Sequence, residues 1–168
     1  MKVVVLGVGN VILADEGVGV RVVEAFEREF VPPDEVTVID GGTAGMELLE
    51  ELSHLDLLIV VDAIAAGKAP GELVKLVGDE VPVFFRRNLS PHGIGLSDVL
   101  ASLEFLGTEP KEMVILGVQP LSMELSTELT PTVAARVPEL MAQVVAELST
   151  RGLASQPRGC KSALAGRR

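Results

Sequence analysis

Leu57-Leu58-Ile59-Val60-Val61, followed directly by Asp62, is the most apolar stretch of this 168-residue chain, and it decides the fold class. An uninterrupted apolar run of this length, rich in β-branched residues, is typical of a strand buried on both faces of a parallel sheet. We therefore expect residues 57–61 to form the centre of the sheet. Residues 2–6 predict a second buried strand, and residues 36–39 and 113–118 predict two more.

Helical periodicity alternates with these strands. Apolar residues three or four apart predict a helix from about residue 16 to Pro32, a short helix over 46–52, a helix over 96–106 and a last helix over 133–148. Thr130-Pro131 favours a helix start, and Pro138 predicts a kink or break in the last helix. Residues 72–77 and 81–85 predict a hairpin or meander at the sheet edge. The alternation predicts a single α/β domain over residues 1–149, with a mostly parallel sheet between helices.

Composition excludes several classes of protein. The net charge of −10 argues against nucleic-acid binding, which needs a basic face, and no window approaches the roughly 18 apolar residues of a membrane span. One cysteine favours a reducing compartment over a disulfide framework, so we expect a cytoplasmic protein. Residues 150–168 are basic and rich in Ser, Gly, Ala and Pro, which predicts a mostly disordered tail.

Glycines and acids crowd the loop after the first strand. Gly7-Val8-Gly9-Asn10 suggests a dinucleotide-binding loop, but Ile12 stands where the third glycine is required. Asp15 and Glu16 would also repel a phosphate from the start of the following helix. Asp15 alone is explained as a helix cap, whereas the second acid and the number of glycines favour a functional loop.

Two more candidates follow other elements. Asp62 lies at the carboxyl end of the central strand, where ligands of open α/β sheets bind, although a strand-end cap is an equal reading. His92 lies on the loop 88–93, whereas His54 reads as a surface residue. Together Glu16, Asp62 and His92 are the ligand set of a divalent site, suited to nickel or zinc, with open positions. The same three groups are also suited to metal-free acid–base catalysis.

Five motifs in this order resemble those of the hydrogenase maturation endopeptidases. They are Gly7-x-Gly9-Asn10, Asp15-Glu16-Gly17-x-Gly19, Asp40-Gly41-Gly42-Thr43, Asp62 and Ser90-Pro91-His92, and the similarity runs from residue 2 to about 148. The resemblance implies a twisted five-stranded sheet between helices. It also implies a protease that removes a C-terminal extension from the large-subunit precursor of a nickel–iron hydrogenase after nickel insertion.

The same resemblance assigns roles to individual residues. Glu16, Asp62 and His92 would contact nickel, which the precursor supplies, and would take part in catalysis. Asp40, Gly41, Gly42 and Thr43 would serve substrate recognition and cleavage, with Asp40 a candidate base for a water nucleophile. A non-enzymatic nickel carrier for hydrogenase assembly would need the same three ligands. An amidase or phosphorylase acting on a small molecule shares the general layout but needs a deep pocket.

Overall fold

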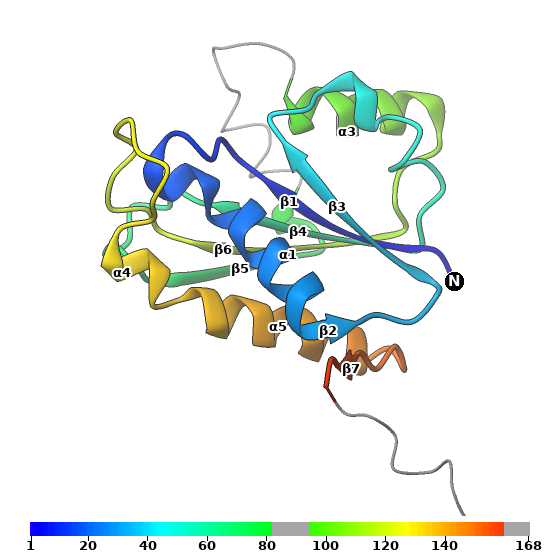
Figure 1. Ribbon diagram of the computed structural model, residues 1–168. Helices are drawn as coiled ribbons and strands as arrows, with labels where there is room; N and C mark the ends of the chain where they lie inside the picture. The colour runs from blue at the N-terminus through cyan, green and yellow to red at the C-terminus, as the bar shows by residue number, and fades with distance from the viewer. Residues whose placement is uncertain (82–94, 160–168) are drawn as a thin grey trace, which may run out of the picture.

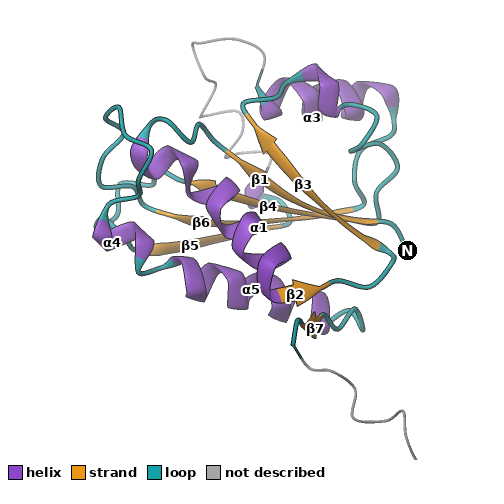
Figure 2. Cartoon of the chain, in the orientation of Figure 1, coloured by secondary structure: helices purple, strands orange, loops and turns teal. Residues whose placement is uncertain are grey.

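The computed structural model of the protein describes residues 1–81 and 95–159. A five-stranded sheet runs through the domain in the order β3-β1-β4-β6-β5 (Figures 1 and 2). Strands β1 (Val3–Val8), β3 (Val36–Gly42), β4 (Leu57–Ala63) and β6 (Glu112–Val118) are parallel, and β5 (Leu73–Val77) pairs antiparallel with β6 at the edge. The predicted α/β fold with a mostly parallel sheet is confirmed, and β4 occupies its centre.

Helices cover both faces of the sheet. In Figure 1, α1 (Val18–Glu29) and α5 (Val137–Ser149) cross one face, and α3 (Leu96–Leu106) lies on the other. The 3-10 helices η1 (Ala14–Gly17) and η2 (Met46–Leu48) join strands to these layers, and α4 (Pro131–Ala134) precedes α5. A small antiparallel pair, β2 (Phe30–Val31) with β7 (Gln156–Pro157), lies beside the main sheet.

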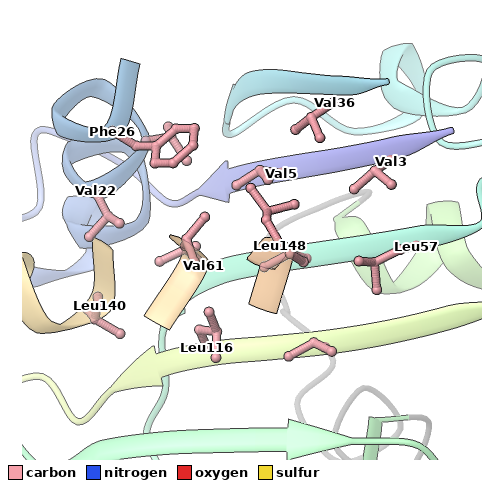
Figure 3. Packing of buried hydrophobic residues seen from close by; sticks show 14 of the residues in the cluster. Val3, Val5, Val22, Phe26, Val36, Leu57, Val61, Leu116, Leu140 and Leu148 are labelled. Atoms are coloured by element: carbon pink, nitrogen blue, oxygen red, sulfur yellow. The ribbon is translucent and has the colours of Figure 1, made fainter. Parts of the chain in front are cut away.

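Side chains of β4 alternate between two apolar cores because successive strand residues point to opposite faces. Leu57, Ile59 and Val61 pack toward α1 and α5, as Figure 3 shows for Leu57 and Val61. Leu58 and Val60 pack toward η2 and α3. All five are at most 1% exposed, so the uninterrupted apolar run is required by burial on both sides.

Three expectations need correction. The second strand of the predicted hairpin, expected over residues 81–85, does not begin at Val81, because Val81 has helical backbone. Residues 82–85 lie outside the described part. The helix expected over 46–52 is only the single turn η2, followed by turns. The tail is not disordered over 150–159: Leu153 packs into the α1–α5 core and β7 pairs with β2.

Other expectations are confirmed. The last helix is broken into α4 and α5, and Pro138 lies in the first turn of α5, where its missing N–H costs no hydrogen bond. His54 is exposed, as expected. Among the described residues, no helix has both the length and the apolar character needed to cross a membrane.

Candidate functional site at the carboxyl edge of the sheet

The glycine-rich connection from β1 to α1 lies directly on the ends of β1 and β4. A Cβ added to Gly19 would stand 2.0 Å from the carbonyl oxygen of Val61 and 2.5 Å from that of Val8. Gly9 has a φ of 124°, and a Cβ there would stand 1.8 Å from the carbonyl oxygen of Glu16. Only glycine permits these approaches. They bring the turn that carries Glu16 against the end of the central strand.

Asp62 and Glu16 are neighbours at this edge. Both side chains are partly buried, and the Asp62 carboxylate accepts a hydrogen bond from the backbone N–H of Ala63 at 2.8 Å. Burial raises the pKa of Asp62 to about 8; the bond from Ala63 opposes the shift, and the negative charge of Glu16 adds to it. Within the described residues, neither carboxylate forms an ion pair with a basic side chain. The two residues are therefore an acidic pair with no basic partner among the described residues, and Asp62 keeps its proton near neutral pH.

The third expected ligand, His92, lies outside the described residues. Across residues 1–81 and 95–159, no group of three or more His, Cys, Asp or Glu side chains is placed to hold a metal ion. The structure thus brings together two of the three expected ligands. Carboxylate oxygens suit a divalent cation but do not by themselves select among such metals.

Asp40 lies at the same edge but not in the acidic pair. In the strand register, Asp40 is opposite Gly7 of β1, which is in turn opposite Val61 of β4. Two strand spacings separate the backbones of Asp40 and Val61 by roughly 10 Å. Asp40 is exposed. Asp40 therefore lies at the same edge as Asp62 but two strands away from it.

The following residues shape the end of β3. Gly41 is buried, and a Cβ there would stand 2.8 Å from the side chain of Leu6. Gly42 has a φ of 47°, and its carbonyl accepts a hydrogen bond from the N–H of Gly9 at 2.8 Å. Thr43 is exposed. The two motifs, far apart in sequence, are thus joined by backbone contacts at one edge.

The structure gives Asp15 a different role from the helix cap that its place in the sequence suggests. Its side chain is fully buried and makes no capping bond to η1 or α1. Instead one carboxylate oxygen accepts the backbone N–H groups of Leu121 at 2.9 Å and Ser122 at 3.0 Å. The other accepts the N–H of Thr130 at 2.8 Å, and the Thr130 hydroxyl donates to the carboxylate as well. Asp15 therefore anchors both ends of the β6–α4 loop, residues 119–130.

The hydrogen bonds favour the charged form of the Asp15 carboxylate. Burial alone would raise the pKa of Asp15, but the hydrogen bonds from Ser122, Thr130 and Leu121 together hold it below its usual value. Thr130 does precede α4, as predicted, but its hydroxyl bonds Asp15 and makes no side-chain cap. The bonds join residues more than 100 positions apart, so no local sequence pattern indicates them.

Residues 20–147 match the family model described as hydrogenase maturation protease. The chain belongs to this family. It is 48% identical to the hydrogenase 2 maturation protease of Escherichia coli over 159 residues, which cover 94% of this chain and 97% of the relative. It is 44% identical over 151 residues to the hydrogenase expression/formation protein HupD of Bradyrhizobium diazoefficiens, covering 87% of this chain and 79% of HupD.

Solved structures of hydrogenase maturation proteases share the fold. The maturating endopeptidase HybD from E. coli superposes with a TM-score of 0.89 at 47% identity, over 94% of this chain and 98% of HybD. The [NiFe] hydrogenase maturation protease HycI from Thermococcus kodakarensis superposes with a TM-score of 0.69 at 25% identity, over 88% and 92% of the two chains. The resemblance inferred from the five motifs is confirmed, and with it the activity of a maturation protease.

Proposed function

We propose that this hydrogenase maturation protease removes the C-terminal extension of a nickel–iron hydrogenase large-subunit precursor after nickel has been inserted. The names of its relatives support hydrogenase maturation, and HycI of T. kodakarensis is named for a [NiFe] hydrogenase. The removal of a C-terminal extension, and its dependence on nickel, follow from the motif resemblance. With one cysteine in 168 residues, the chain suits a reducing compartment, so we place the reaction in the cytoplasm.

The observation that carries the proposal is the pair formed by Glu16 and Asp62. The negative charge of Glu16 repels the ionised form of Asp62, whose raised pKa keeps it protonated near neutral pH, and no basic side chain among the described residues offsets that repulsion. A divalent cation presented by the precursor would remove that repulsion. With His92 as a third ligand, the set would be incomplete without the precursor, so a nickel-free precursor would bind poorly.

Cleavage of the peptide bond then requires a nucleophile and a base. The described part of the site offers carboxylates but no activated serine or cysteine, which favours water as the nucleophile. Asp40 is exposed at the same edge, roughly 10 Å from the backbone of β4 and within the span of a bound peptide. We assign it the role of base, and we assign substrate recognition to Asp40 together with Gly41, Gly42 and Thr43.

The test is cleavage of nickel-loaded precursor by variants of the ligands. Glu16→Ala, Asp62→Ala and His92→Ala should each lower the cleavage rate at least a hundredfold while leaving the fold intact by circular dichroism. Glu24→Ala is the matched control, because Glu24 is exposed on α1 and, among residues 1–81 and 95–159, pairs with Arg21 alone. Normal cleavage by all three ligand variants would refute the proposal. Unchanged precursor mass with the wild-type protein would instead favour a nickel carrier.

A further inference from the structure

Two loops at the carboxyl edge expose large apolar side chains. On the β6–α4 loop, Leu121 is 54% exposed, Met123 46% and Leu125 81%. On the β1–η1 loop, Ile12 is 49% exposed. We call these four side chains the rim patch. Apolar side chains gathered on one exposed surface are a common mark of a protein-binding site, whereas scattered ones are not.

The two loops are held together along their backbones. The N–H of Ser126 donates to the carbonyl of Ile12 at 3.0 Å, and the N–H of Ala14 donates to the carbonyl of Ser126 at 2.9 Å. Asp15 adds its bonds to Leu121 and Ser122. Figure 1 shows the two loops side by side at this end of the sheet. The patch is therefore one surface on a fixed backbone, which lowers the entropic cost of binding.

The loops that carry the rim patch adjoin the segments that carry Glu16 and Asp62. Asp15, which binds Leu121, directly precedes Glu16 in the chain. The β6–α4 loop starts where β6 ends, at Val118, which is paired with Ala63 next to Asp62. A polypeptide lying over Glu16 and Asp62 would therefore reach the patch within a few residues.

We propose that the rim patch binds an apolar segment of the hydrogenase precursor and holds the precursor over the acidic pair. This inference rests on the proposed function, since it takes the precursor as the occupant. The position of the patch favours that occupant over a second copy of this chain. A second copy seated there would cover the edge through which the precursor must reach Glu16 and Asp62.

The experiment compares two double variants, each of which replaces two exposed apolar residues by serine. Leu121→Ser/Leu125→Ser removes the two most exposed patch residues. Phe105→Ser/Leu106→Ser removes two exposed residues, 91% and 58% exposed, at the end of α3. That end leads into the start of β6, at the opposite edge of the sheet. For nickel-loaded precursor, the patch variant should raise KM at least tenfold with kcat within twofold, and the control variant should change neither.

Direct binding separates this inference from the proposed function. Affinity for nickel-loaded precursor, measured by titration calorimetry, should fall at least tenfold in the patch variant and stay unchanged in the control. If the wild type binds but does not cleave, and the patch variant loses binding, the patch stands and the proposed function fails. Wild-type KM and affinity in the patch variant would overturn the inference while leaving cleavage in place. A wild-type dimer that the patch variant converts to monomer would also overturn it, by showing a second copy as the occupant.

Discussion

Replacing Asp15 by alanine should release the β6–α4 loop and destabilise the protein. The buried carboxylate accepts three backbone N–H groups, from Leu121, Ser122 and Thr130, together with the Thr130 hydroxyl. Alanine offers none of these donors a partner. The loop would keep its backbone bonds to residues 12, 14 and 15, the bond that Arg21 donates to the carbonyl of Thr127, and the bonds of Gln119 to residues 66, 68, 71 and 72.

The size of the effect follows from those bonds. Losing a hydrogen bond to a charged group costs about 1.5–3 kcal/mol when the donor is left buried and unpaired. Leu121 is exposed and Ser122 only partly buried, so water would replace part of the loss, to about 1 kcal/mol for each bond. Removing a buried charge recovers some desolvation energy. We expect the free energy of unfolding to fall by about 2–4 kcal/mol at pH 7.

Urea unfolding and amide hydrogen exchange measure the two consequences. Asp56→Ala is the matched control: Asp56 accepts bonds from the Lys2 N–H and the Lys111 ammonium but is open to solvent, so the free energy of unfolding should change far less than in Asp15→Ala. Folding lowers the pKa of Asp15. Its contribution to the free energy of unfolding is therefore complete above the ordinary pKa of about 4 and is lost as the pH falls through the pKa of the folded state. Wild-type stability in Asp15→Ala, with unchanged exchange at Leu121, Ser122 and Thr130, would refute the anchoring role.

Two further predictions concern the acidic pair and the loop that carries it. Folding raises the pKa of Asp62 to about 8, so the folded form retains a proton that the unfolded form has lost, and metal-free protein should lose stability as pH rises from 5 to 8. Asp62→Asn should remove this slope, up to about 1 kcal/mol per pH unit, in urea titrations at several pH values; parallel pH profiles for the two proteins would contradict it. Gly19→Ala should destabilise the fold by about 2 kcal/mol or more and lower cleavage, because its Cβ would strike the Val61 carbonyl at 2.0 Å. Gly95→Ala, where a Cβ would meet no atom of the described residues within 4 Å, should cost about 1 kcal/mol or less, and equal losses in urea unfolding would exclude the steric explanation.

Local sequence pattern predicted the elements that burial defines. The five apolar residues of β4 are buried on both faces, so their continuous run identified the centre of the sheet. The stripe of α1 and the break before Pro138 follow equally from local rules. The carboxyl ends of parallel strands lie at one edge of the sheet, so the sequence alone predicts that Glu16 and Asp62 lie close together.

Contacts between distant segments were not predictable in this way. Asp15 had the pattern of a helix cap, and nothing near it in sequence shows that its partners are residues 121, 122 and 130. Residues 150–159 have the composition of a disordered tail, yet one apolar side chain, Leu153, and the β2–β7 pairing fix them to the domain. The role of His92 stays a prediction, since it lies outside the described residues.

The most direct test is the intact mass of a cognate hydrogenase large-subunit precursor before and after incubation with this protein. The precursor is prepared both with nickel and without it. The proposed function predicts loss of a C-terminal peptide from the nickel-loaded form alone. An unchanged mass of the nickel-loaded precursor would contradict processing by this chain, and equal cleavage of both forms would contradict recognition of the metal by Glu16, Asp62 and His92.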